Sequence, residues 1–209
     1  MESSAERDGD TDRDDGVGTR ERIIRAASRL MQRQGYDGTG IKQIAQEAGA
    51  ALASVYHFFP GGKKELAVAA IQRGEEEFAD ELRVAFDQEE DPAEAIVLCT
   101  RRLAEGLRAS DWVDGCPVTS TALGSASRAD DIQRAAASAF AHWRDLVLDR
   151  LLRAGVDADA AHDLAHTVIS TLEGAELAAQ VSRDATPLHA AGRHLAQLIR
   201  LAQGTPARS

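Results

Sequence analysis

The sequence has few of the features that mark secreted, membrane-spanning or all-β proteins. It contains only two cysteines, Cys99 and Cys116, which cannot form the disulfide framework of a small secreted domain. No run of about 18 apolar residues occurs, so the sequence predicts no membrane span. The first residues hold no apolar segment of a secretory signal. Together these absences predict a cytoplasmic protein.

Aromatic residues and prolines are also scarce. The 209 residues include five Phe, two Trp, two Tyr and five Pro. A β-sandwich or barrel needs more aromatic and β-branched residues than this, so the composition favours helices. Hydrophobic residues still make up 44% of the chain, which is enough for a buried core. The length suits one large domain or two small ones.

The acidic net charge hides an uneven distribution. The formal net charge is −10, yet residues 19–66 hold eight basic and four acidic residues. Residues 1–18 are rich in Asp and lack periodicity, which predicts a disordered acidic tail. A positive segment creates a local field that can attract a polyanion even when the whole chain is acidic. The charge therefore does not exclude nucleic acid as a partner.

Hydrophobic spacing predicts an all-α fold. The first helix begins at Thr19 and ends at Gly35, the second begins at Thr39 or Gly40, and the third spans residues 51–58. Further helices are expected over residues 63–87, 91–109, 117–124, 129–154, 157–181 and 185–204. The sequence thus predicts about nine helices and no convincing strand.

The two short helices around Ala48-Gly49-Ala50 are typical of a helix-turn-helix. In that motif the second helix enters the major groove of DNA while the first crosses the backbone. A glycine suits the turn because the chain must reverse within a few residues. The pattern alone is weak evidence, since many helical bundles contain a helix–Gly–helix corner.

A longer ordered set of residues resembles the DNA-binding domain of the tetracycline-repressor (TetR) family over roughly residues 18–75. The matching residues are Gly35-Tyr36, Thr39, Ile44-Ala45, Ala48-Gly49, Ser54 to Phe59, Gly62-Lys63 and Glu65-Leu66. The remainder resembles the LmrA/YxaF-type regulators of this family. That likeness rests on Pro60-Gly61-Gly62-Lys63, Gly115-Cys116-Pro117-Val118, Thr121-Ala122-Leu123, Trp143 and Glu173-Gly174-Ala175.

The resemblance implies a homodimeric transcription factor, usually a repressor, that a small hydrophobic molecule releases from its DNA operator. It places the helix-turn-helix domain in residues 19–66 and a ligand-binding and dimerisation domain in residues 67–209. The candidate DNA-contacting residues are Arg22, Thr39, Lys42, Gln43, Leu52, Ala53, Ser54, Tyr56, His57 and Lys63. Tyr56, His57 and Lys63 match the phosphate-contacting positions of the family. Thr39 is expected to cap the second helix and present backbone N–H groups to a phosphate.

The recognition helix departs from the family pattern at its start. Family members usually carry Ser, Thr or Pro near position 51 and often Lys, Arg or Thr at position 52, where this chain has Ala51 and Leu52. Loss of a side-chain N-cap removes about 1 kcal/mol in typical helices. Leu52 and Ala53 can still touch thymine methyl groups. We predict weaker or more shape-dependent operator selection, or base reading by Lys42 and Gln43.

Ligands in helical bundles lodge between helices, so the helices after residue 63 are expected to surround a pocket. Its candidate lining residues are Phe78, Leu82, Phe86, Leu103, Leu107, Trp112, Cys116, Thr119, Thr121, Trp143 and Glu173. The apolar members fit an ordinary core equally well. Cys116 could contact ligand, sense oxidants or simply be buried. Glu173 could approach the pocket, lie at the surface or serve as a helix cap.

The last two helices are expected to pair with their symmetry mates in a dimer. Their shared apolar faces comprise Ala161, Leu164, Val168, Leu172, Ala175 and Ala179, then Leu188, Ala191, Leu195, Leu198 and Ile199. A twofold dimer presents two recognition helices to half-sites about 34 Å apart.

Two other classes of function are an enzyme and a helical adaptor. His162 and His166 share a helix face, but no third metal ligand, nucleophile elbow or Gly-rich phosphate loop accompanies them. The sequence therefore predicts no enzyme, no metal site and no cofactor. The other alternative is a helical adaptor of the same fold that has lost specific DNA binding.

Overall fold

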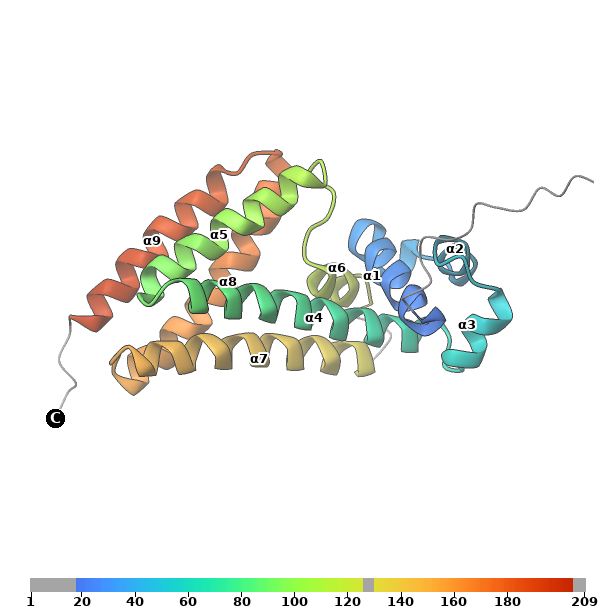
Figure 1. Cartoon of the computed structure of the whole chain (residues 1–209), viewed down its shortest axis with the longest axis horizontal. Coiled ribbons are helices and arrows are strands. Elements are labelled where there is room, and N and C mark those ends of the chain that lie inside the picture. Colours follow the sequence, from blue (N-terminus) through green and yellow to red (C-terminus); the bar gives the residue numbers. More distant parts are fainter. Residues whose placement is uncertain (1–17, 126–129, 205–209) are drawn as a thin grey trace, which may run out of the picture.

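A computed structural model describes residues 18–125 and 130–204, and these residues form nine helices without a strand (Figure 1). The helices are α1 (Thr19–Gly38), α2 (Ile41–Glu47), α3 (Leu52–Phe58), α4 (Lys63–Gln88), α5 (Pro92–Ala109), α6 (Pro117–Ser125), α7 (Asp130–Arg153), α8 (Ala158–Ser182) and α9 (Thr186–Gln203). The predicted all-α fold is confirmed. The predicted disordered tail lies outside the described residues except for Gly18.

The molecule is elongated, with α1, α2 and α3 gathered at one end (Figure 1). The helices α5, α8 and α9 form the other end, and the long α4 and α7 run side by side between the two. Helix α4 packs against α1, α5, α6 and α7, so it joins both ends in one framework. None of the helices in the described residues is long and apolar enough to cross a lipid bilayer.

The three N-terminal helices share one small core. Ile23 and Met31 of α1, Ile44 of α2 and Val55 of α3 are completely buried. Their helical spacing places them on the inner faces, where the loss of apolar surface to water stabilises the packing. Gly49, between α2 and α3, has a φ of 58°, a conformation that favours glycine. The predicted reason for a glycine in this turn is confirmed.

The end of the first helix differs from the prediction. Gly35 leaves the helical conformation, with φ 71° and ψ 176°, but the chain makes a further turn through Gly38 before α2 begins. The predicted helix end at Gly35 therefore corresponds to a kink within α1. The extra turn places Thr39 directly in front of α2.

The predicted dimer face of α8 and α9 is wrong for most of its members. Eight of them are buried inside the protomer: Ala161, Val168, Leu172, Ala179, Leu188, Ala191, Leu195 and Ile199. Helix α7 covers α8, and α5 covers α9. Helical spacing identifies residues that share a face, but it does not identify the element that covers that face. Leu198 of the predicted face is exposed, and the exposed apolar residues outside the predicted set are Leu177, Val181 and Leu201.

Candidate nucleic-acid interface and ligand cavity

The outer surface of α2 and α3 exposes most of the predicted DNA-contacting residues. Lys42, Gln43, Leu52, Ala53, Tyr56 and His57 are all exposed. Tyr56 keeps 49% of its surface accessible, so its ring is not a core element. The second helix of the motif thus presents a continuous outer side to solvent, as groove entry requires.

Helix α3 starts without a side-chain cap. Ala51 is the N-cap residue, with φ −66° and ψ 143°, and no side chain accepts a hydrogen bond from the first turn. The predicted absence of a capping side chain is confirmed. The first N–H groups of α3 are therefore left for water or another acceptor.

Thr39 does not cap α2, contrary to the prediction. Gly40 is the N-cap residue of α2, and no side chain caps that helix. Thr39 is 1% exposed, and its Oγ1 donates to the carbonyl oxygen of Gly35 at 2.8 Å. The hydroxyl closes the extra turn at the end of α1 because that turn brings the Gly35 carbonyl within reach. Ser54 on α3 is partly buried.

Arg22 and Lys63 both hold backbone groups of the motif. Nε of Arg22 donates to the carbonyl oxygen of Ala48 at 3.2 Å, at the end of α2. Nζ of Lys63 lies 4.4 Å from the ring centroid of Tyr36 and donates to the carbonyl oxygen of Asp37 at 3.4 Å. The two side chains therefore stabilise the turns before and after α2, and this structural role is separate from the predicted contacts with DNA.

Three further arginines of α1 are paired with carboxylates. Arg25 lies 3.1 Å from Glu21, and Arg29 lies 3.4 Å from Glu47 of α2. Arg33 pairs with Asp114, which precedes α6. These partners reduce the positive charge that α1 offers to a phosphate.

A cavity of about 520 Å³ lies beside α4, α5, α8 and the segment before α6. Five predicted ligand contacts line it: Phe78, Leu103, Leu107, Cys116 and Glu173. Six acidic residues face it (Glu77, Asp80, Glu81, Asp114, Glu173 and Glu176) together with one arginine, Arg102. The volume is within the range of small-molecule sites.

The other predicted lining residues lie elsewhere. Leu82, Thr121 and Trp143 are completely buried in the core, and Phe86 packs against that core. Trp112 packs near Leu107 in a second cluster. Trp143 lies one layer behind the cavity wall. The centroids of the Trp143 and Phe78 rings are 4.9 Å apart with the rings nearly perpendicular, and Nε1 of Trp143 donates to the carbonyl oxygen of Glu75 at 2.9 Å. Thr119 lines a smaller cavity of about 160 Å³ together with Cys116 and Glu173, and it donates its hydroxyl to Glu173 at 2.6 Å.

Burial changes the acidity of three groups at the cavity wall. It raises the pKa of the Glu176 carboxyl to about 8, with a smaller effect from the charge of Glu173. Burial also raises the pKa of Glu173, which the hydrogen bonds from Thr119 and Cys116 oppose. The Cys116 thiol has a pKa raised well above its ordinary value by burial. A protonated thiol is a poor nucleophile, which favours the buried-residue interpretation of Cys116 over oxidant sensing.

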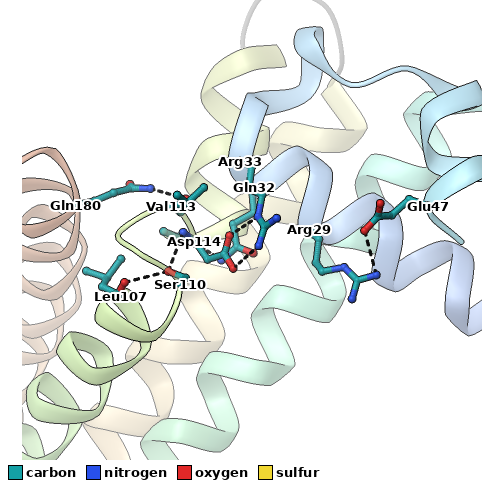
Figure 2. A network of polar contacts seen from close by, with 10 residues as sticks. Arg29, Gln32, Arg33, Glu47, Leu107, Ser110, Val113, Asp114 and Gln180 are labelled. Carbon is teal, nitrogen blue, oxygen red and sulfur yellow. Dashed lines mark hydrogen bonds and ion pairs between the residues drawn. The ribbon is translucent and has the colours of Figure 1, made fainter. Parts of the chain in front are cut away.

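The segment between α5 and α6 connects the cavity wall to α1 (Figure 2). Asp114 accepts two hydrogen bonds from Arg33, at 2.6 and 3.0 Å, and the next carbonyl, of Gly115, accepts one from Gln32. The same segment is also bound to α8, because Gln180 of α8 donates a hydrogen bond to the carbonyl oxygen of Val113 at 2.8 Å. Asp114, Gly115 and Cys116 also line the cavity. The sequence prediction missed this connection because its partners are far apart in the chain.

No cluster of three His, Cys, Asp or Glu side chains capable of holding a metal ion occurs in residues 18–125 and 130–204. His162 and His166 are both exposed on α8. 

Comparison with known proteins agrees with this architecture. Residues 23–70 match the family model described as bacterial regulatory proteins of the tetR family. Residues 92–194 match the model of the LmrA/YxaF-like transcriptional regulator C-terminal domain.

Similar proteins cover nearly the whole chain. The HTH-type transcriptional regulator YxaF of Bacillus subtilis is 32% identical over 182 residues, which is 87% of this chain and 95% of the relative. The regulator LmrA of the same species is 31% identical over 81% of this chain and 90% of its own length. A TetR transcriptional regulator from Legionella pneumophila has a TM-score of 0.77 at 26% identity, covering 87% of this chain and 97% of its own.

The helix-turn-helix geometry, the helical C-terminal domain and these similarities lead to one conclusion. They define a regulator of transcription, not an enzyme. The chain belongs to the TetR family of bacterial transcriptional regulators and carries a C-terminal domain of the LmrA/YxaF type.

Proposed function

We propose that this regulator is a homodimeric repressor, acting in the bacterial cytoplasm, that leaves its operator when a small, largely apolar molecule fills the cavity. Residues 19–66 form the DNA-binding domain in this proposal, and residues 67–209 bind the ligand and dimerise. The observation that carries it is the segment 110–116, which lines the cavity on one side and binds α1 on the other. A ligand that displaces this segment changes the support of the DNA-binding helices.

The exposed residues of α2 and α3 supply the DNA contacts in this proposal. Tyr56, His57 and Lys42 are positioned on the solvent side, where hydroxyl, imidazole and ammonium groups can bind phosphate. Gln43 accepts a hydrogen bond from Gln34 at 2.8 Å, which orients its amide beside Lys42. The pair is available for reading a base edge.

Dimerisation through the outer side of α8 and α9 is supported by exposed apolar side chains. Val181 is 78% exposed and Leu201 is 69% exposed, and Leu177 and Leu198 accompany them. Exposed apolar side chains on two adjacent helices support a protein–protein contact there. A twofold arrangement of that contact gives two α3 helices one duplex turn, about 34 Å, apart.

The test is selective binding to the DNA upstream of the protein's own gene. Labelled upstream duplex is titrated with the purified full chain, in competition with an unrelated duplex of equal length. A repressor of this kind binds the upstream duplex at least about a thousandfold more tightly than the competitor. Equal or absent binding to both duplexes would instead support the helical adaptor without specific DNA binding.

A further inference from the structure

Two glutamates one helical turn apart on α8 face the cavity. Glu173 and Glu176 have i, i+3 spacing, so they share a side of the helix. Both line the cavity. The carboxylate of Glu173 accepts the hydroxyl hydrogen bond of Thr119 at 2.6 Å. Within the described part of the chain, no group donates a hydrogen bond to the carboxyl of Glu176, and no basic side chain pairs with it.

The remaining acidic residues of the cavity already have cationic partners. Each of the other four lies within ion-pair distance of an arginine: Arg102 with Glu81, Arg33 with Asp114, Arg73 with Glu77, and Arg83 with Asp80. Arg102 is the single basic residue among those that line the cavity, and it is engaged by Glu81. The uncompensated acidic groups are therefore the two on α8.

The rest of the wall is suited to an apolar body. Phe78 projects from α4, and its ring is fixed by the edge contact with Trp143. Leu103 and Leu107 of α5 complete the apolar side. An apolar wall facing a pair of carboxyl groups is complementary to a molecule that carries one cationic end.

We propose that the effector of this regulator is an amphipathic cation, an alkyl or aryl amine or ammonium ion, whose charged nitrogen lies between Glu173 and Glu176. The proposal rests on the ligand-released function given above and names the chemical class of that ligand. The nitrogen provides Glu176 with the partner that the protein does not supply. The apolar part of the ligand packs against Phe78, Leu103 and Leu107.

Binding of a cation in this position is coupled to loss of a proton. Burial holds the pKa of Glu176 at about 8, so at neutral pH the carboxyl is mostly protonated in the empty site. A cation favours the ionised form, and affinity therefore rises with pH up to about 8. The other titratable or charged groups that face the site are Glu77, Asp80 and Glu81 of α4, Arg102 of α5, Asp114 and Cys116 before α6, and Glu173. The first three and Asp114 are ion-paired, and the pKa of Cys116 lies well above this range.

The experiment uses three probes with one phenylbutyl skeleton: 4-phenylbutylammonium, 4-phenylbutanol and 4-phenylbutanoate. Each is titrated calorimetrically into the full-length wild type, E176Q and the control D163N. Asp163 is exposed on the same helix, so D163N removes an equal charge outside the cavity. Gln is uncharged and close in shape to a protonated Glu, and circular dichroism verifies that E176Q keeps its helices.

The expected result is that the wild type and D163N bind the ammonium probe at least tenfold more tightly than the alcohol and the carboxylate. E176Q loses at least tenfold in affinity for the ammonium probe only. Between pH 6 and pH 7 the wild-type affinity for the ammonium rises about tenfold, and the E176Q affinity rises less, because only Glu173 of the pair is left to ionise. Equal affinity for the ammonium and the alcohol, no binding of the ammonium, or an unchanged affinity in E176Q would overturn the proposal.

A parallel titration separates this inference from the proposed function. Wild type and E176Q are each added to the upstream duplex without any probe, and both are expected to bind it equally. Ammonium binding without any DNA binding would reject the repressor and leave the assignment of the cavity intact. DNA binding without selective ammonium binding would reject only the assignment of the cavity.

Discussion

Arg33 and Asp114 form a bidentate ion pair, with Nε to Oδ1 at 2.6 Å and Nη2 to Oδ2 at 3.0 Å, although they lie 81 positions apart. The carboxylate raises the pKa of the Arg33 guanidinium through hydrogen bonding and charge. Arg33 belongs to α1, and Asp114 belongs to the wall of the cavity. The pair is therefore a direct contact between the predicted DNA-binding domain and the cavity.

A double-mutant cycle on this pair measures the strength of the contact. Arg33 keeps 49% of its side chain exposed, so water and salt screen the interaction. We expect R33A, D114A and the double variant to give a coupling of about 0.5–1 kcal/mol in urea unfolding at low salt, falling toward zero at about 1 M NaCl. A coupling that is absent at low salt would contradict the pairing.

Operator selection is expected to depend on α2 more than the family pattern implies. Lys42 and Gln43 are exposed, whereas α3 begins with the apolar residues Ala51, Leu52 and Ala53. The double variant K42A/Q43A should change the preferred bases at one position of each half-site, by about 1–3 kcal/mol of discrimination. Selection of bound duplexes from a randomised pool measures this. The control is R193A, which removes an exposed charge from α9, and an unchanged preference in K42A/Q43A would refute base reading by α2.

The dimer prediction concerns the outer side of α8 and α9. V181D and L201E place charges at residues that are 78% and 69% exposed, so the fold of the protomer tolerates them. A carboxylate buried between two protomers without a partner costs several kcal/mol, roughly enough to shift a dimer to monomers at micromolar concentration. Sedimentation velocity measures the change.

The matched control for these variants is L123E. Leu123 is 71% exposed as well, but it lies on α6 and is not part of the proposed dimer surface. It should leave the oligomeric state unchanged. A dimer that persists in V181D/L201E, or one that L123E abolishes, would place the interface elsewhere.

Glu176 is expected to make stability depend on pH. Its pKa is about 8 in the folded chain against an ordinary value of 4.5, so the folded state binds more protons between these values. Folding stability therefore falls as pH rises from about 5 to 8, by at most about 1.4 kcal/mol per pH unit. E176Q should reduce this slope, since Glu173 keeps a raised pKa, and should be more stable than wild type at pH 8. Urea unfolding at pH 5, 6.5 and 8 tests it, and an equal slope in both proteins would show that Glu176 ionises normally.

Much of the fold could be predicted from the sequence because local signals mark its boundaries. The predicted helix at residues 63–87 is Lys63–Gln88, and the one at residues 129–154 is Asp130–Arg153. Gly49 marks the tight turn through its backbone freedom, and Ala51 reveals an uncapped helix without reference to tertiary structure. These features depend on residues within a few positions of one another.

The parts that could not be predicted depend on distant partners. The buried and exposed faces of α8 both contain alanine and leucine, so the positions of α5, α7 and α9 decide that Leu172 is buried and Leu177 exposed. Thr is a common N-cap residue, so the sequence predicts that Thr39 caps α2. The kink at Gly35 instead brings the Gly35 carbonyl within reach, and the Thr39 hydroxyl donates to it. The sequence gives one indication of Glu176, its place one turn after Glu173 on α8, but its position in the cavity wall depends on helices from distant parts of the chain.

In the proposed function, the exposed outer side of α2 and α3 binds duplex DNA as part of a dimer. The most direct measurement is the affinity of the full chain for its upstream duplex at several salt concentrations between 50 and 200 mM, a range over which proteins with several phosphate contacts lose about a thousandfold or more in affinity. We expect the logarithm of the affinity to fall linearly with the logarithm of the salt concentration, with two protomers bound per duplex. Affinity that does not change with salt, or no binding at the lowest salt concentration, would contradict it.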